Sequence, residues 1–249
     1  GFSNGGALAM KYSLDALDNA ELAKPQRVIL ISPMIGITSF ARFSGLAGWP
    51  AFLPAFSKAA WLNIMPEFNP FKYNSFPTNA ARQSFLLTKA LQKQMVTDSR
   101  NHRLNSLPPV LTFQSVVDST VSTRAIVTAL YNRLPENGSE IVLFDLNHAV
   151  RFNSLLRRTS YTALARLLPA PPRAYQTTII TNANSASTDM EIRTTPAGKT
   201  DTTVEKLQGM RYLPDVYSLS HVALPFPLSD SLYGRYPHPL NQYGISLGT

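Results

Sequence analysis

The sequence predicts an α/β fold in which a mainly parallel sheet alternates with helices. A helix-forming stretch over residues 7–14 follows a glycine-rich start and precedes an aliphatic run within residues 26–33. We expect that run to be a strand buried on both faces. Further along the chain, strand patterns over residues 108–118 and 139–146 flank a helical pattern over residues 123–134. Strand, helix and strand in this order predict parallel strands joined by right-handed crossovers.

Length and composition bound the class of protein. The 249 residues, 44% of them hydrophobic, are enough for one large domain or a domain with a subdomain. We find no apolar run long enough to span a bilayer and no signal peptide. The lack of cysteine excludes a disulfide framework, a cysteine nucleophile and thiolate metal sites. These features leave the localisation open, and we favour the cytoplasm.

The chain carries a net charge of +8, which raises the question of nucleic acid or an anionic membrane as partner. Its basic residues lack the interleaved basic and aromatic pattern of nucleic-acid-binding modules, so we expect no nucleic-acid partner. The densest basic patch lies on or near an expected amphipathic helix over residues 150–168, and we interpret it as the solvated face of that helix. A surface that faces membrane lipid is the alternative. The patch comprises Arg151, Arg157, Arg158, Arg166 and Arg173.

Residues 1–6 fit the pattern G-x-S-x-G, the nucleophile elbow, in which a serine occupies a tight turn between a strand and a helix. Such a turn imposes strained backbone angles on Ser3, so its neighbours need small side chains. Gly1 and Gly5 meet that need, and Gly6 allows the following helix to pack closely. We therefore predict that Ser3 is a nucleophile. The alternative is a glycine-rich turn without chemistry.

Residues 38–107 differ in character from the segments on either side. Aromatic residues are dense there, prolines divide the stretch, and residues 79–96 form its one longer helical pattern, whereas no strand pattern appears. We predict a helical cap over the carboxyl edge of the sheet, inserted into a core made of residues 1–37 and 108–249. Its aromatic side chains form the cap's own core or, in part, line an acyl pocket.

A carboxylate stands at the end of the second predicted strand. Asp118 is the last residue of the segment 108–118, just past the expected carboxyl end of its strand and in the loop before a helix. Chain order serine, acid, histidine is the order that the serine-elbow fold uses, so Asp118 is the candidate acid. The alternative role is to cap the helix that begins near Ser122.

The catalytic base has to be one of four histidines. His102 lies in a charged loop at the wrong end of the sheet, and His238 lies between two prolines. His148 and His221 each follow a predicted strand, the second of them over residues 215–220. Spacing alone favours His148, since it needs only one helix and one strand after Asp118.

The rest of the chain completes the expected sheet. Residues 175–181 read as a strand, residues 182–189 as a polar turn, and the threonine-rich stretch up to residue 209 as an exposed excursion or weak hairpin. The tail beyond residue 228 reads as a loop.

The order of elbow, aromatic cap, aspartate at a strand end and late histidine resembles the α/β-hydrolase superfamily. Residues 69–77 (NPFKYNSFP) and 218–227 (SLSHVALPFP), with Asp230 and Tyr233-Gly234 beyond, resemble bacterial lysophospholipase- or monoacylglycerol-lipase-like members. The resemblance implies Ser3 as nucleophile, Asp118 as orienting acid and His221 as general base. On that ground we favour His221 and keep His148 as the alternative base.

The oxyanion hole of such enzymes uses the backbone N–H after the nucleophile, here that of Asn4, and a second N–H from a loop before the elbow. The chain starts at the elbow, so we expect it to be the C-terminal portion of a hydrolase. The expected activity is hydrolysis of acyl-glycerol or lysophospholipid esters. The alternatives are a peptidase or acyltransferase on the same triad and a non-catalytic binding domain on this scaffold. Histidine spacing and the absence of a phosphate loop predict no metal and no cofactor.

Overall fold

The computed structural model describes residues 1–36, 61–63, 76–118, 120–149, 163–213 and 216–218. The chain divides into two compact units. The first unit joins residues 1–37 to residues 87–222, and the second joins residues 38–86 to residues 223–249. Most of the predicted cap, residues 38–60 and 64–75, lies outside the described residues.

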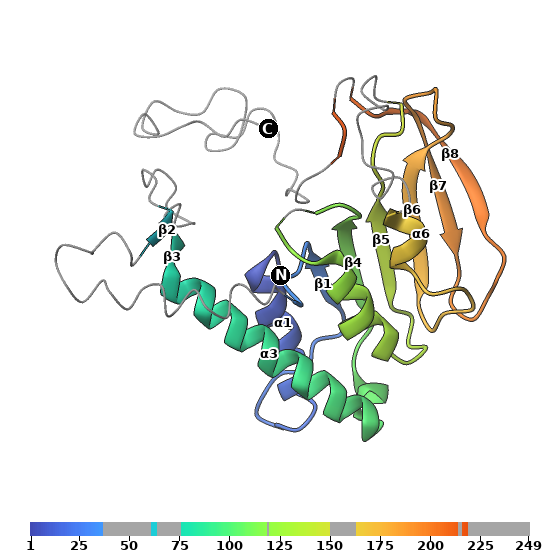
Figure 1. The fold of residues 1–249 in the computed structure, drawn as a ribbon. Coiled ribbons are helices and arrows are strands. Elements are labelled where there is room, and N and C mark those ends of the chain that lie inside the picture. Colours follow the sequence, from blue (N-terminus) through green and yellow to red (C-terminus); the bar gives the residue numbers. More distant parts are fainter. Residues whose placement is uncertain (37–60, 64–75, 119, 150–162, 214–215, 219–249) are drawn as a thin grey trace. The chain divides into compact units, whose positions relative to one another are not determined.

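A six-stranded sheet forms the centre of the first unit, in the order β1-β4-β5-β6-β7-β8 (Figure 1). The first four of these strands are parallel to one another, and β6, β7 and β8 are antiparallel neighbours. The α/β class predicted from the sequence is therefore confirmed. The strands are β1 (Val28–Ile31), β4 (Val110–Ser115), β5 (Glu140–Phe144), β6 (Gln176–Asn182), β7 (Asp189–Thr195) and β8 (Thr203–Arg211).

Helices occur where the apolar periodicity predicts them. The first helix, α1, spans Asn4–Asp15, and α3 spans Thr78–Arg100, which extends the predicted helix of residues 79–96 at both ends. The stretch from residue 123 is helical but irregular: α4 (Thr123–Ala125) continues as a π-helix (Ile126–Leu130) and a 3₁₀ turn (Tyr131–Arg133). A 3₁₀ turn also spans Arg103–Ser106. Of the helix expected over residues 150–168, only α6 (Ala163–Leu167) lies among the described residues.

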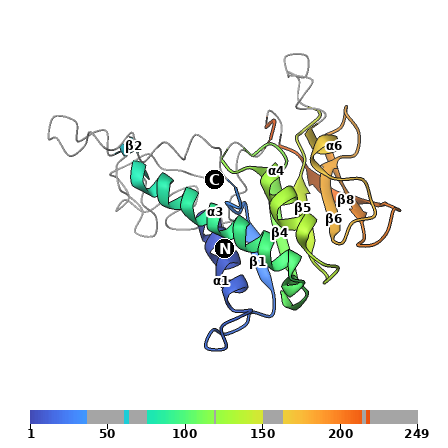
Figure 2. The same cartoon turned by 60° about the horizontal axis from the view of Figure 1, so that its bottom comes forward.

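One hydrophobic core joins α1, α3 and the helical stretch after residue 123 to the sheet, and Figure 2 shows these helices together beside β1 and β4. Alternate residues of a strand face opposite sides of the sheet. Val28 and Leu30 of β1 enter the core, whereas Ile29 between them is 49% exposed. The prediction that this strand is buried on both faces is wrong. The core includes Ala7, Met10, Leu14, Leu91, Met95, Val110, Ile126, Leu130, Tyr131, Ile141 and Leu143.

Two further sequence-based expectations are corrected. Within the region expected to lack strands, β2 (Trp61–Asn63) pairs with β3 (Phe76–Pro77) as an antiparallel two-stranded sheet. Strands this short depend on a partner remote in sequence, so periodicity does not reveal them. The described part of the strand expected over residues 215–220, residues 216–218, is not in a strand. Its peptide groups bond to the loop after β5 instead, through the carbonyl oxygen of Tyr217.

The hairpin expected after β6 is present and adds β7 and β8 to the sheet. β8 is exposed along nearly its whole length, in keeping with its threonine-rich and charged composition. Among the described residues, none of the helices combines the length and the apolar character needed to cross a membrane.

Candidate active site

Ser3 adopts a backbone conformation that a residue with a side chain rarely takes. It stands immediately before α1 with φ 50° and ψ −120°. Three hydrogen bonds hold its peptide groups: its N–H donates to the carbonyl oxygen of Ile31 at 3.0 Å, and its carbonyl oxygen accepts from Gly6 at 3.0 Å and Met34 at 2.9 Å. Strained backbone of this kind persists only where the surroundings over-determine it, and it gathers at functional sites.

The glycines around Ser3 have different reasons to be glycine. A Cβ on Gly1 would lie 2.4 Å from the carbonyl oxygen of Gly5, so the turn closes only without a side chain there. A Cβ on Gly6 would lie 2.7 Å from Cβ of Pro33, which confirms the close packing expected at Gly6. A Cβ on Gly5 would meet nothing within 4 Å. The expectation that position 5 needs a residue without a side chain is therefore wrong. It is the backbone of Gly5 that lies against Gly1.

Asn4 is the first residue of α1, so its N–H belongs to the first turn of the helix. The N–H groups of a first turn have no acceptor within the helix, and the helix dipole places partial positive charge there. A negatively charged oxygen that forms beside Ser3 would be stabilised by such a group.

Asp118 follows β4 and organises the turn that leads into α4. Its Oδ1 accepts from the backbone N–H groups of Thr120 at 2.7 Å and Val121 at 3.0 Å, and its Oδ2 accepts from Nε2 of Gln114 at 3.1 Å. The helix cap itself is Ser122, whose hydroxyl accepts from the N–H of Ala125 at 3.2 Å. The alternative role of Asp118 as the cap of this helix is thus taken by Ser122.

The sheet brings the candidate residues to one edge. Phe2 pairs in parallel with Ile31 at the end of β1, so the order across the sheet is Phe2, β1, β4 and β5. Ser3, Asp118 and His148 follow Phe2, β4 and β5, each at the carboxyl end. Neighbouring strands of a sheet lie about 4.8 Å apart. The strand position of Phe2, which precedes Ser3, is therefore roughly 10 Å from β4, which precedes Asp118, and roughly 14 Å from β5, which precedes His148.

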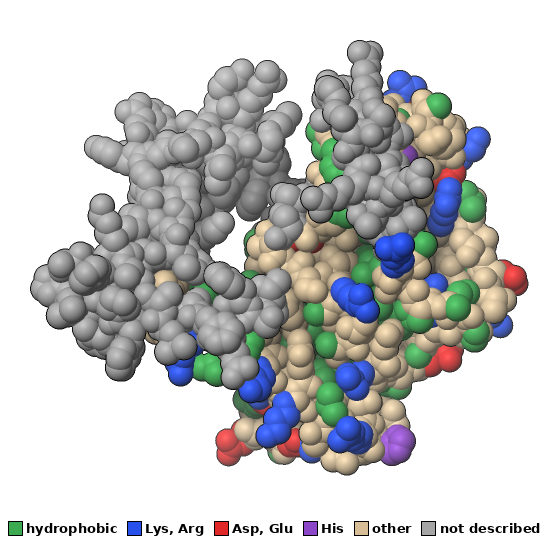
Figure 3. All heavy atoms as spheres, viewed as in Figure 1, with side chains coloured by type: hydrophobic (Ala, Val, Ile, Leu, Met, Phe, Trp, Pro, Cys, Tyr) green, Lys and Arg blue, Asp and Glu red, His purple; other side chains and the backbone are tan. Residues whose placement is uncertain are grey.

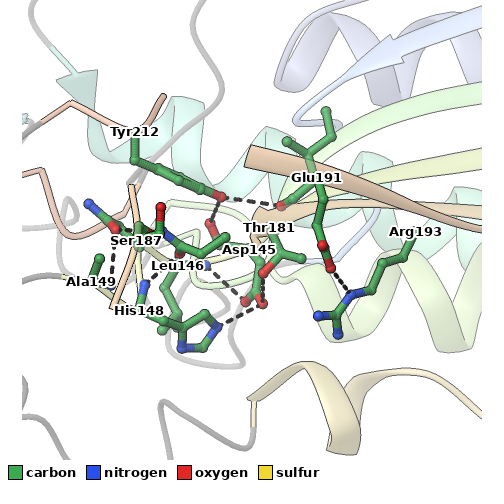
Figure 4. A network of polar contacts seen from close by, with 12 residues as sticks. Asp145, Leu146, His148, Ala149, Thr181, Ser187, Glu191, Arg193 and Tyr212 are labelled. Atoms are coloured by element: carbon green, nitrogen blue, oxygen red, sulfur yellow. Dashed lines mark hydrogen bonds and ion pairs between the residues drawn. The ribbon is translucent and has the colours of Figure 1, made fainter. Parts of the chain in front are cut away.

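His148 is held by a second carboxylate that the sequence analysis did not single out (Figure 4). Its Nε2 lies 3.0 Å from Oδ2 of Asp145, the residue that directly follows β5. The side chain of Asp145 is 6% exposed and that of His148 is 22% exposed. Oδ2 of Asp145 also accepts from the hydroxyl of Thr181 at 3.1 Å, and Oδ1 accepts from the N–H of Leu146 at 2.8 Å.

Buried amides anchor the loop that carries His148. Oδ1 of Asn182, at the end of β6, accepts from the N–H of His148 at 2.7 Å, and its Nδ2 donates to Oδ1 of Asn147 at 3.0 Å. The N–H of Asn147 donates to the carbonyl oxygen of Tyr217 at 2.7 Å. Residues 216–218 therefore run beside the loop of His148.

The other predicted site residues fall into two groups. His221 and His238 lie outside the described residues, so the preference for His221 stays a prediction. His102 is exposed beside the 3₁₀ turn of residues 103–106, as expected of a surface residue. No group of three or more His, Asp or Glu side chains that could hold a metal ion occurs in the described part of the chain.

The basic patch is described only at Arg166 and Arg173. Arg166 is exposed, whereas Arg173 is half-buried and donates to the carbonyl oxygen of Pro169 and to the hydroxyl of Thr177. Burial lowers the pKa of Arg173. Figure 3 shows lysine and arginine side chains spread over the viewed face among apolar and other groups.

Comparison of the chain with family models, with curated proteins and with solved structures finds no match. Function therefore has to be argued from the site.

Sequence reasoning missed Asp145 and Asn182. The signal that points to Asp145 is its spacing from His148 in Asp-Leu-Asn-His, a segment that begins at the end of the predicted strand of residues 139–146. Asn182 leaves no such signal, because its contacts with the His148 loop cross 34 residues of sequence.

Proposed function

We propose that the protein is a serine hydrolase of the α/β-hydrolase fold that cleaves carboxylic esters. The observation that carries the proposal is the backbone of Ser3, which is strained at the junction between a parallel strand position and the start of α1. A serine in that position projects its hydroxyl at the carboxyl edge of a parallel sheet, where such folds bind ligands.

The proposed chemistry assigns one step to each group. Oγ of Ser3 attacks the ester carbonyl, and a histidine takes the proton and returns it to the leaving alcohol. The N–H of Asn4 stabilises the oxyanion. Chain order predicts Asp118 as the acid that orients this histidine, and Asp145, which contacts His148, is the competing carboxylate.

His148 is the better-supported base. It follows β5, the strand beside that of Asp118, and its ring is already oriented by a buried carboxylate. His221, implied by the resemblance, is the competing assignment, and both histidines enter the same experiment below.

The proposed substrates are acyl-glycerol or lysophospholipid esters, presented at a lipid surface. The proposed substrate class rests on the resemblance to lipase-like hydrolases and on the aromatic residues of segment 38–107. A peptidase or acyltransferase would use the same groups, so the substrate class needs its own measurement. The competing proposal, from a different class, is a binding domain that retains the scaffold without catalysis.

A fluorophosphonate probe tests the nucleophile, because it forms a bond only with an activated serine. We expect the protein to be labelled on Ser3 and Ser3→Ala to remain unlabelled. Labelling of Ser3→Ala at the rate of the parent protein, or no labelling of either, would reject the serine hydrolase and favour the binding domain.

The base is identified by comparing His148→Gln with His221→Gln. We expect the first to slow labelling by at least about a hundredfold, as loss of a general base does, and the second to change it little. The reverse result would assign the base to His221. A series of p-nitrophenyl esters of increasing acyl length then tests the lipid preference, which predicts faster turnover of medium or long chains than of acetate.

A further inference from the structure

The carboxylate of Asp145 lies 3.0 Å from Nε2 of His148, and its chemistry bears on the state of the imidazole ring. An ionised carboxylate only accepts hydrogen bonds. Two fixed donors, the N–H of Leu146 and the hydroxyl of Thr181, already point at Asp145. The contact at 3.0 Å between Oδ2 and Nε2 of His148 is therefore made by an N–H on Nε2.

A neutral imidazole carries its proton on one nitrogen and a lone pair on the other. With the proton of His148 on Nε2, Nδ1 is the basic nitrogen, and it points away from Asp145 because the two ring nitrogens diverge. A residue that fixes the tautomer of a catalytic histidine decides which nitrogen accepts the proton.

The contact is rigidly built. Asp145 is nearly buried at the end of β5, and the hydroxyl of Tyr212 donates to its carbonyl oxygen at 2.9 Å and to that of Ile180 at 3.2 Å (Figure 4). Asn182 holds the backbone of His148 from the neighbouring strand at 2.7 Å. The side chain and the main chain of His148 are thus positioned from two strands of the sheet.

Asp118 helps to order its own turn. Its two oxygens accept from two backbone N–H groups of its own turn and from the amide of Gln114. Those contacts shape the loop between β4 and α4, a structural task that a carboxylate in a turn commonly performs.

From these observations we infer that Asp145 is the positioning carboxylate of His148, which it holds in the Nε2–H tautomer so that Nδ1 takes the proton of Ser3. The inference rests on the proposed serine hydrolase and adds to it a residue that chain order alone does not suggest. When Oγ of Ser3 bonds to the ester carbonyl carbon, its proton moves to Nδ1. The imidazolium, stabilised by Asp145 at Nε2–H, then passes that proton to the oxygen of the departing alcohol.

The first test is made on the unaltered protein. Nitrogen-15 spectra of the histidine rings distinguish the two tautomers, and His148→Gln identifies which of the four histidine signals belongs to His148. We expect the neutral ring of His148 to carry its proton on Nε2, with Nδ1 unprotonated. A ring protonated on Nδ1 would overturn the inference without reference to any variant at Asp145.

The second test compares two carboxylates by fluorophosphonate labelling of Ser3. Asp145→Asn retains the shape and an acceptor for the N–H of Leu146, yet we expect labelling to slow about 10²- to 10⁴-fold, as for loss of an orienting acid. We expect Asp118→Asn to slow labelling less than Asp145→Asn does. Thr181→Val removes only the second donor to Oδ2 and is the matched control, with an expected change under tenfold.

The outcomes separate the two proposals. Normal labelling of the parent protein with unchanged labelling of Asp145→Asn would overturn the role of Asp145 and leave the serine hydrolase standing. A larger loss in Asp118→Asn than in Asp145→Asn would do the same and assign the orienting acid to Asp118. Absence of labelling in the parent protein would reject the hydrolase, and the inference with it.

Discussion

The N–H of Met34 donates to the carbonyl oxygen of Ser3 at 2.9 Å, so the loop after β1 binds the residue whose backbone is strained. A second hydrogen bond comes from β1 itself, where the carbonyl oxygen of Ile31 accepts from the N–H of Ser3. The conformation of Ser3 is therefore held both by the end of β1 with its following loop and by the N–H of Gly6 in α1.

The strained backbone of Ser3 predicts that a substitution can raise the stability of the protein while it removes the proposed nucleophile. Ser3→Gly removes the Cβ that conflicts with a φ of 50°, and strain of this kind costs about 1–3 kcal/mol. Glycine also raises the entropy of the unfolded chain, which offsets about 0.4–1 kcal/mol of that gain. Ser3→Ala keeps the conflict and serves as the control.

We expect Ser3→Gly to exceed Ser3→Ala by about 1 kcal/mol in free energy of unfolding, measured with urea, while neither reacts with a fluorophosphonate. Equal stabilities of the two variants would mean that the strain at Ser3 is no larger than the entropic cost of glycine, about 0.4–1 kcal/mol, and would contradict the expected difference.

Two adjacent glycines of α1 should respond in opposite directions to the same change. A Cβ at Gly6 would meet Cβ of Pro33 at 2.7 Å and its Cα at 2.9 Å, whereas a Cβ at Gly5 would enter open space. Both residues are helical, so alanine brings about 0.5–1 kcal/mol of helix propensity at either position. Only Gly6→Ala also creates a clash.

We expect Gly5→Ala to raise the free energy of unfolding by about 0.5 kcal/mol and Gly6→Ala to lower it by about 1–3 kcal/mol, the usual cost of overpacking. Urea titration of the pair measures both. A loss of stability in Gly5→Ala comparable to that in Gly6→Ala would contradict the difference in space at the two positions.

Buried tyrosines predict a loss of stability at alkaline pH. The hydroxyl of Tyr131 donates to carbonyl oxygens of Val110 and Glu140, and burial raises the pKa of Tyr131 above its ordinary value of 10.0. Burial, with the charge of Asp145 as a smaller cause, also raises the pKa of Tyr212. The folded protein keeps both phenols neutral at pH values where the unfolded chain ionises them.

Because the folded pKa is the higher one, this contribution is intact below about pH 10 and declines as pH rises beyond it, by up to about 1.4 kcal/mol per pH unit for each tyrosine. Urea titrations between pH 8 and pH 11 measure the slope. Tyr131→Phe should cost about 1 kcal/mol at pH 8 and decline less steeply above pH 10. A slope unchanged by the substitution would remove Tyr131 as a cause.

Asn182, which holds the loop of His148, and the exposed Asn184 can be compared by the same substitution. Asn182 is buried and bonds to the main chain of His148, to the side chain of Asn147 and to the carbonyl oxygen of Ser187. Asn182→Ala leaves these partners unsatisfied, at a cost of about 1–3 kcal/mol. Asn184, two residues further along, is exposed and bonds within its own turn.

We expect Asn184→Ala to change the free energy of unfolding by no more than about 0.5 kcal/mol and to leave labelling of Ser3 unaltered. Asn182→Ala should lower both stability and labelling. Full stability in Asn182→Ala would mean that the loop of His148 is held by other contacts.

Local pattern predicted much of this fold because local forces decide it. The apolar faces of residues 7–14 and 79–96 and the aliphatic run before Pro33 each specify an element within a few residues, and those elements are present. Gly1 likewise indicates a tight turn, since the steric conflict that it avoids, with the backbone of Gly5 and Gly6, is local. Chain order was enough to place Ser3, Asp118 and His148 at carboxyl ends of strands.

Tertiary pairing decided the rest. The exposure of Ile29 depends on which face of β1 the helices cover, and β2 with β3 depends on a partner remote in sequence. The contact of Asp145 with His148 could be suspected from their spacing, but only the fold shows that the carboxylate is buried and shares Oδ2 with Thr181. By itself the sequence determined where the strained turn at Ser3 lies. The packing of β5 and β6 decided which carboxylate holds the histidine, because burial and partner choice arise only once strands distant in sequence lie side by side.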